Sequence, residues 1–383
     1  MANTFKFGNG NWAVKEDYAL AYNDENNNFK PLPFDFTRAS SATRVNKQGL
    51  IETVGSGKPR IDFLDNTKGH LLLEPSRTNI ITNSELFVDA PTGNTNMDVF
   101  SGTITNNNTT SPDGNTKGMK YTISSGSSAL LRIYQSDLST STDTTFSIYA
   151  KKGTTDSFSI NIAGGTATST TLTDEWQRIT TTDTSNTSKF IDVTVSGSVG
   201  EYIYIFGMQA EAGSYATSYI PTSGSSVTRT ADDISLTLPD NASFDSSVGF
   251  SVVSKFDIGA AGTGTSAPFI LFNDDTSSTY IGFGSNSSNL RCRFNLSGTA
   301  YLNTQLNAPR TQRNSLFISC DANGWSQGAN GVTNHTGNND ASVFNKMASI
   351  TYTTSEVYGI IKISELLIYN TRLSDSELEQ LTS

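Results

Sequence analysis

The chain has 383 residues, of which 26 are Lys or Arg and 36 are Asp or Glu, so its formal net charge at pH 7 is −10. An acidic chain with scattered basic residues offers no basic stripe for phosphates, which argues against a nucleic-acid partner. No apolar run approaches the roughly 20 residues that cross a bilayer, and residues 1–8 lack the apolar segment of a secretory signal, so neither membrane insertion nor export by a signal peptide is predicted.

The composition indicates an all-β protein. Hydrophobic residues make up 35% of the chain and fall in short alternating clusters, while Ser, Thr, Asn and Gly supply most of the polar residues. These small polar residues suit strands and turns and are poor helix formers. The two cysteines, Cys292 and Cys320, both fall on apolar strand faces, which favours buried thiols over a disulfide.

Residues 1–84 contain two hairpin signals. The first joins strands at 43–45 and 50–52 through a turn in which Gly49 supplies a positive φ, and the second joins strands at 60–64 and 70–74. Two hairpins bury little by themselves, so this region needs a neighbouring domain or another subunit. We therefore predict a segment at 1–84 that attaches the chain to a larger assembly.

Basic residues gather in the same region. Arg38, Arg44, Lys47 and Arg60 could dock on an acidic surface of a partner, and we predict this attachment role for them. The alternative is ion pairing within the chain, which is the default for interspersed charges. The acids available nearby for such pairing are Asp35, Glu52 and Asp62.

Strand signals at sandwich spacing follow over 85–222, separated by Gly, Ser, Asn and Asp clusters. The strongest cover residues 129–135, 145–150, 157–162, 176–180, 190–195 and 202–208. The last has apolar residues on both faces, which predicts a central strand covered on both sides. Trp176 alternates within its strand, which predicts a packing role, and the composition of 219–226 predicts a linker.

A second β unit is predicted over 223–383. Its strand candidates are 249–258, 268–272, 279–283, 290–296, 315–321 and 358–369. One helix ends the chain, because Ser374 and Glu377 fit a capping box and Leu373 and Leu378 fit the hydrophobic staple around it.

Three groups of motifs resemble known families. The stretch FTRASSATRV at 36–45, together with 49–52, 59–62 and LLEPSRTN at 72–79, resembles a segment that recurs in bacteriophage tail-fibre and other virion-surface proteins. The stretch FGMQAEAGS at 206–214, continued at 216–222 and 228–232, is similar to the end of the carbohydrate-binding-module-like jelly roll of the same proteins. Residues 360–381 are similar to the closing strand and helix of laminin-G-like, concanavalin-like sandwiches.

The resemblance implies a structural phage protein on the virion surface, on tail or head. It implies an attachment segment at 1–84, a jelly roll at 85–222 and a laminin-G-like sandwich at 223–383. The implied partners are other virion proteins of capsid or tail, further copies of the chain with a trimer favoured, and host surface glycans. Such a protein is made in the host cytoplasm and released by lysis.

Sugar binding by β-sandwiches needs an exposed aromatic ring with amide or carboxylate groups beside it. Trp325 is the best-placed tryptophan because it lies in a polar stretch predicted as a loop or hairpin, and Asn330 and Tyr280 are its candidate companions. The alternative is that Trp325 covers a sheet edge.

No cofactor is expected to be required. Asp274 and Asp275 offer oxygen ligands that would suit a structural calcium ion, although a solvated turn is favoured for so short an acidic pair.

The sequence argues against an enzyme. Glycan cleavage needs two suitably spaced carboxylates, and no strand carries the acidic motif of glucanases related to laminin-G-like domains. The two histidines, His70 and His335, lie near no nucleophile turn. Two alternatives stay open: a secreted bacterial glycan-binding adhesion protein, and a polysaccharide depolymerase.

Overall fold

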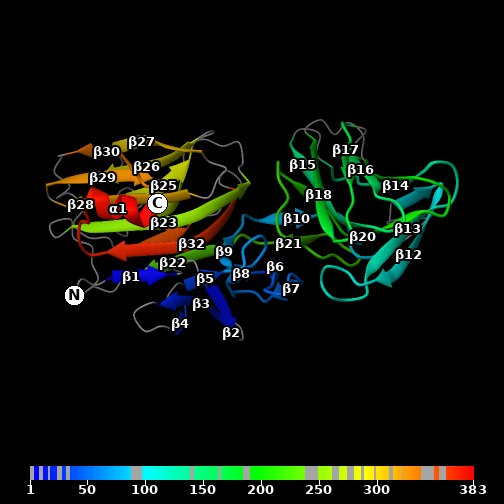
Figure 1. Cartoon of the computed structure of the whole chain (residues 1–383), viewed down its shortest axis with the longest axis horizontal. Coiled ribbons are helices and arrows are strands. Elements are labelled where there is room, and N and C mark those ends of the chain that lie inside the picture. Colours follow the sequence, from blue (N-terminus) through cyan, green and yellow to red (C-terminus); the bar gives the residue numbers. More distant parts are fainter. Residues whose placement is uncertain are drawn as a thin grey trace. The chain divides into compact units, whose positions relative to one another are not determined.

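A computed structural model describes most of the chain in two units. The described residues are 4–7, 12–15, 18–23, 28–31, 35–87, 97–138, 142–162, 165–183, 190–237, 249–260, 267–273, 280–285, 289–296, 299–309, 314–321, 323–337, 349–352 and 359–383. Unit 1 comprises Met1–Ser41, Val54–Ser76 and Thr230–Ser383, and unit 2 comprises Ala42–Thr53 and Arg77–Arg229. Both are built from antiparallel strands (Figure 1), which confirms the all-β prediction.

Two large sheets dominate unit 1. One runs in the order β30 (Val332–Gly337), β29 (Gly324–Ala329), β28 (Asn314–Asp321), β23 (Phe250–Ala260), β32 (Ile360–Tyr369), β9 (His70–Leu73) and β8 (Arg60–Asp62), and β1 (Thr4–Phe7) also pairs with β32. The other runs in the order β27 (Thr299–Pro309), β26 (Asn289–Leu296), β25 (Tyr280–Ser285), β24 (Ala267–Asn273), β31 (Ser349–Tyr352), β22 (Asp233–Thr237) and β5 (Asp35–Thr37). A smaller sheet contains β2 (Trp12–Lys15), β3 (Tyr18–Asn23) and β4 (Asn28–Pro31).

The first sheet of unit 1 is buried on both faces where β23 lies between β28 and β32. Val253 is opposite Phe317 and Leu367, and these three pack with Leu378 of the C-terminal helix α1 (Asp375–Thr382), which lies against this sheet in Figure 1. The preceding residue, Val252, points to the other face and is also buried. Helix α1 covers one face of this sheet, and the burial of Val252 shows that the other face is also covered, as in a sandwich.

The predicted hairpins form, but the structure joins them to the large units rather than setting 1–84 apart. The hairpin of β8 and β9 extends the first sheet of unit 1, because β9 pairs with β32. The hairpin of β6 (Ala42–Val45) and β7 (Ile51–Val54) falls almost entirely in unit 2. Gly49 and Gly69 have φ values of 80° and 74°, and they supply the left-handed positions of the two turns.

Unit 2 is a second sandwich. Its first sheet runs β11 (Met97–Phe100), β14 (Ser128–Tyr134), β19 (Phe190–Ser196), β16 (Ser157–Ile162) and β17 (Thr168–Thr171), and its second runs β12 (Gly102–Thr109), β13 (Gly118–Ile123), β20 (Tyr202–Ala212), β15 (Thr144–Lys152) and β18 (Gln177–Asp183). Leu131 and Val193 of the first sheet and Phe146 and Ile205 of the second belong to one buried cluster. The apolar core therefore lies between the two sheets. A further pair, β10 (Arg77–Asn79) with β21 (Val227–Arg229), closes this unit.

The predicted linker at 219–226 is wrong over its first residues. Tyr219 and Ile220 are buried in unit 2, and the Thr43 hydroxyl donates to the Tyr219 carbonyl at 2.5 Å. Tyr219 also packs with Phe206 and Ile51, so this segment and the β6–β7 hairpin cover part of the outer face of the second sheet. Trp176 lies partly buried beside the same cluster and donates its indole N–H to the Thr110 carbonyl at 3.0 Å, which agrees with its predicted packing role.

The C-terminal capping box is confirmed, since the Ser374 side chain accepts from the Glu377 amide and the Glu377 side chain accepts from the Ser374 amide. Cys292 and Cys320 are buried and are not joined by a disulfide. In the described part of the chain, no helix is long and apolar enough to span a membrane.

Candidate functional site

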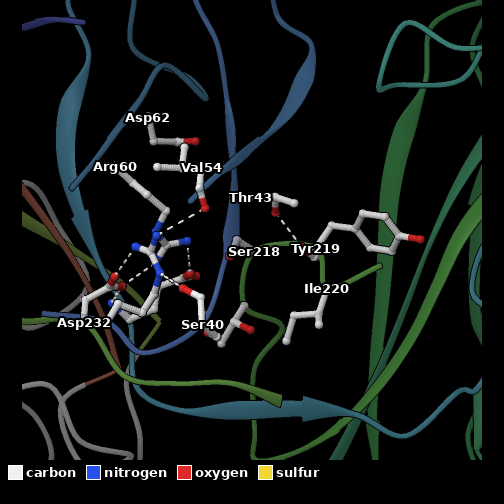
Figure 2. Close-up of polar contacts among 12 residues, drawn as sticks. Ser40, Thr43, Val54, Arg60, Asp62, Ser218, Tyr219, Ile220 and Asp232 are labelled. Carbon is white, nitrogen blue, oxygen red and sulfur yellow. Dashed lines mark hydrogen bonds and ion pairs between the residues drawn. The ribbon is translucent and has the colours of Figure 1, made fainter. Parts of the chain in front are cut away.

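The motifs that carry the virion-protein resemblance place four charged side chains together inside unit 1. Arg60 is paired with Glu74 through Nη1 at 2.7 Å and with Asp232 through Nη2, and all three side chains are fully buried. The Asp232 carboxylate also accepts from Arg38 at 2.9 Å. Figure 2 shows the Asp232 side chain beside this guanidinium cluster. Burial alone would lower the pKa of Arg60, but the charges of Asp232 and Glu74 outweigh it and raise that pKa.

Arg38 is held on every side by the chain. Its Nε donates to the Ser40 carbonyl at 2.8 Å, and its two terminal nitrogens donate to the carbonyls of Lys58 at 3.0 Å and Gly55 at 2.6 Å. A guanidinium bound in this way is a structural element, since its five N–H groups are directed at fixed acceptors.

Two of the four residues predicted to attach the chain to a partner are therefore not available for that role. Arg38 and Arg60 are buried, which removes them from any exposed docking surface. Arg44 is ion-paired with Glu52, as the intramolecular alternative expected, while Lys47 is exposed in the β6–β7 turn. Arg38 and Arg60 thus serve the fold, while attachment through Arg44 and Lys47 stays a prediction.

The second group of motifs forms a buried polar network inside unit 2. The Glu211 carboxylate accepts from the Gln209 amide at 2.7 Å and from the Thr217 hydroxyl at 2.7 Å. Burial raises the pKa of Glu211, and those hydrogen bonds oppose the rise. Asn79 donates to the carbonyls of Met208 at 3.1 Å and Ile220 at 2.9 Å. Buried polar groups satisfied in this way specify local structure, so these motifs encode the fold of unit 2 and not an exposed ligand site.

The residues predicted to bind glycan are not brought together. Trp325 lies in β29, the second strand of a hairpin with β28, as the hairpin alternative predicted. There it is partly buried and its ring lies over the backbone of Gly337 on β30. Asn330 follows the other end of β29, roughly 16 Å away at ~3.3 Å per residue, and its side chain bonds Asn314 and the Ser315 amide. The side chain of Tyr280 lies outside the described residues. Glycan binding at Trp325 stays a prediction, and unchanged host-cell binding by Trp325→Ala would contradict it.

The predicted calcium ligands Asp274 and Asp275 lie outside the described residues. Within the ranges that the structure describes, no group of three His, Cys, Asp or Glu side chains is arranged to hold a metal ion.

An exposed aromatic surface occupies the outer face of the first sheet of unit 2. Register places Phe100 opposite Leu130, and Tyr134 opposite Phe190, on the face away from the core. Phe100 is 46% exposed and Tyr134 is 39% exposed. Four residues of β14 separate their rows, a distance of ~13 Å along the strand. We call this surface the aromatic face; its members are Phe100, Leu130, Arg132, Tyr134, Phe190 and Asp192.

Polar groups lie between the two exposed rings. Arg132 donates to both carboxylate oxygens of Asp192, at 2.7 and 2.8 Å, and its guanidinium stacks over the Phe190 ring with 4.0 Å to the centroid. The hydrogen bonds to Asp192 raise the pKa of Arg132. A rigid bidentate pair beside exposed rings is the combination of flat apolar surface and oriented hydrogen-bonding groups that a saccharide needs.

Part of this surface could be predicted from the sequence. The alternation Leu130, Arg132, Tyr134 against Leu131 and Ile133 marks the outward residues of the predicted strand 129–135. The position of Phe100 on this surface could not be predicted, because the short strand β11 follows a polar stretch and shows no alternation by itself.

Comparison with known proteins gives partial structural similarity. No family model and no curated protein matches the chain. The binding domain of Paraclostridial Mosquitocidal Protein 1 is similar at 12% identity and a TM-score of 0.33, with 39% of this chain and 40% of that chain covered. The botulinum neurotoxin serotype D binding domain is similar at 11% identity and a TM-score of 0.34, with 39% and 40% covered. A mutant Trypanosoma rangeli sialidase with trans-sialidase activity is similar at 14% identity and a TM-score of 0.29, with 36% and 23% covered. The chain thus spans well under half the length of these structures, and no function is carried over from them.

Proposed function

We propose that the chain is a structural protein of a bacteriophage virion surface that binds host glycans through unit 2. The observation that carries the binding half of this proposal is the aromatic face, where two exposed rings flank the bidentate pair of Arg132 and Asp192. Single saccharide contacts of this kind are weak, and display in many copies on a particle multiplies them.

The virion half of the proposal is supported by the resemblance of the motifs at 36–79 and 206–232 to virion-surface proteins. We propose that the chain assembles with itself, a trimer being favoured, and with capsid or tail proteins. Mass spectrometry and immunolabelling of purified particles test this half. A chain found on tail or head supports it, and a chain secreted by uninfected bacteria, absent from particles, favours the rival adhesion protein.

Glycan binding is tested by substituting the two exposed rings. We expect Phe100→Ala and Tyr134→Ala each to weaken binding to host cells about tenfold, or ~1.4 kcal/mol, as for a central contact of a binding surface. Leu86→Ala is the matched control, since Leu86 is an exposed apolar residue of the same unit outside the aromatic face. Equal binding by all three variants and the unchanged chain would contradict a site at this face.

We propose no catalytic activity. Incubation of the protein with host capsule or O-antigen, followed by an assay for new reducing ends, separates binding from the depolymerase alternative. Release of reducing ends would overturn the non-enzymatic proposal.

A further inference from the structure

A tyrosine flanked by two lysines lies on the outer face of the second sheet of unit 2. Strand β20 runs between β13 and β15, and antiparallel register places Lys120 on one side of Tyr204 and Lys151 on the other. Residues directly opposite in such pairs share a face, with Cβ atoms about 4.5–5.5 Å apart. Ile203 and Ile205 on either side of Tyr204 are buried in the core, so Tyr204 and both lysines point outward. All three are partly exposed.

Tyr202 extends this row into a preformed platform. Its ring lies 5.4 Å from the Tyr204 ring at an interplanar angle of 71°, and the Lys120 ammonium lies 3.9 Å from the centroid of the Tyr202 ring. Gly153 lies beneath the same ring, because a Cβ at Gly153 would approach Tyr202 to within 2.6 Å of its aromatic carbons. The backbone amide of Tyr202 is fixed as well, by a 3.0 Å bond to the Thr154 hydroxyl. We call Lys120, Lys151, Tyr202 and Tyr204 the lysine–tyrosine platform.

The platform carries positive charge that the described residues do not neutralise. Lys120 and Lys151 form no ion pair with any described carboxylate, whereas Lys152, the next residue along β15, lies 3.8 Å from Asp156. The neighbours of Lys120 on this face, Thr105 and Thr122, are uncharged. In a chain of net charge −10, two uncompensated ammonium groups that flank one tyrosine are a local exception.

The Tyr204 hydroxyl remains a hydrogen-bonding group at neutral pH. Burial, and then the hydrogen bond with Tyr202, raises the pKa of Tyr204, so its phenol stays protonated. Two ammonium groups beside phenol rings match a ligand with a flat apolar body, hydroxyl groups and a negative charge.

We propose that the lysine–tyrosine platform binds an acidic saccharide, a sugar residue that bears a carboxylate or a sulfate group. The anion is held by Lys120 and Lys151, and the ring of the sugar lies against Tyr204. Two lysines in one row do not make the extended basic stripe that tracks a nucleic-acid backbone, so the saccharide is the better match. This inference rests on the proposal that unit 2 binds glycans, but it concerns the sheet opposite the aromatic face.

Affinity electrophoresis of the full chain in alginate, a polyuronate, and in neutral dextran tests the proposal. We expect Lys120→Gln and Lys151→Gln each to weaken alginate binding about fivefold, the upper range for one exposed charge contact, and added salt to weaken it further. Tyr204→Ala should lower the affinity more than Tyr204→Phe, because only the first removes the ring. Thermal unfolding of each variant checks that the fold is retained.

Lys152→Gln is the matched control, since it removes the same charge from the adjacent residue. Alginate binding that falls equally in Lys152→Gln, or dextran binding as tight as alginate binding, would overturn the proposal in favour of diffuse charge or general sugar affinity. Equal loss of single-stranded DNA and alginate binding in the lysine variants would overturn the saccharide assignment. Phe100→Ala serves to separate the two proposals, because it should weaken host-cell binding and leave alginate binding unchanged.

Discussion

Arg60 and Asp232 are 172 residues apart in the sequence and form an ion pair in which both side chains are fully buried. A buried pair contributes little net stability over an apolar substitute, but removal of one partner leaves an uncompensated charge. The pair therefore acts as a constraint on which distant segments of unit 1 come together.

Asp232→Asn should destabilise unit 1 by about 3–5 kcal/mol, because it leaves Arg60 and Arg38 facing a neutral amide in a buried site. Urea unfolding followed by tryptophan fluorescence measures this loss. Asp233→Asn is the control, since it removes the same charge from the adjacent, exposed residue. We expect that variant to be as stable as the unchanged chain; two equally destabilised variants would be inconsistent with a specific role for Asp232.

Unit 2 should lose stability in acid through Asp113. Hydrogen bonds from Ser111 at 2.6 Å and from Asn115 at 3.0 and 3.1 Å outweigh the effect of partial burial and lower the pKa of Asp113 from its ordinary value of 3.8 to about 2. A carboxyl with a lowered folded-state pKa stabilises the fold above its unfolded-state pKa, and this contribution disappears as the pH falls from about 4 through about 2. Asp113→Asn should flatten this part of the stability profile, as measured by thermal unfolding across the acid range. An unchanged slope would argue against the low pKa.

Gly337→Ala should displace the ring of Trp325. A Cβ at Gly337 would approach three atoms of that ring to 2.6–2.7 Å, closer than any ordinary contact. We expect a fluorescence shift and a destabilisation of about 1–3 kcal/mol from overpacking. Gly57→Ala is a control for the loss of a glycine, because a Cβ there meets nothing within 4 Å, although its φ of 68° adds backbone strain. A fluorescence shift of the same size in both variants would speak against the contact.

Trp12→Phe should weaken the attachment of the first strands to unit 1. The Trp12 indole donates to the Ser364 carbonyl at 2.9 Å, and its side chain is buried. Phe keeps most of the apolar contact but leaves that carbonyl without its donor, at a cost of about 1–3 kcal/mol. Native-state hydrogen exchange should then show faster exchange in β1 and in the part of β32 that pairs with it. Unaltered protection of these strands would contradict a stabilising role for the hydrogen bond from Trp12 to Ser364.

Local patterns in the sequence predict the strands better than their partners. Strand β16 has the predicted bounds, 157–162, because its Phe and Ile residues alternate strictly with polar residues. Strand β29 was not among the predicted strands, because its sequence, GWSQGA, has little apolar content. The strand is held by its pairing with β28 and β30. The pairing of β9 with β32 joins residues nearly 300 positions apart, and no local signal encodes it.

The candidate sites follow the same rule. Arg38 and Arg60 look like surface charges in the sequence because their partners, Glu74 and Asp232, come from other segments. The lysine–tyrosine platform likewise takes Lys120, Lys151 and Tyr204 from three strands, each unremarkable alone. Side chains that share a row only across strands become visible once the register is known.

The chain passes between its two units at four places, since unit 2 takes Ala42–Thr53 and then Arg77–Arg229. A single recombination breakpoint within the gene would therefore split at least one of the two sandwiches, so that part of it would come from each parent gene. Exchange of unit 2 as a whole between related genes requires coordinated replacement of two separate coding stretches, with the intervening Val54–Ser76 left in place. We expect the two sandwiches to be inherited together and to diversify by substitution on their outer faces.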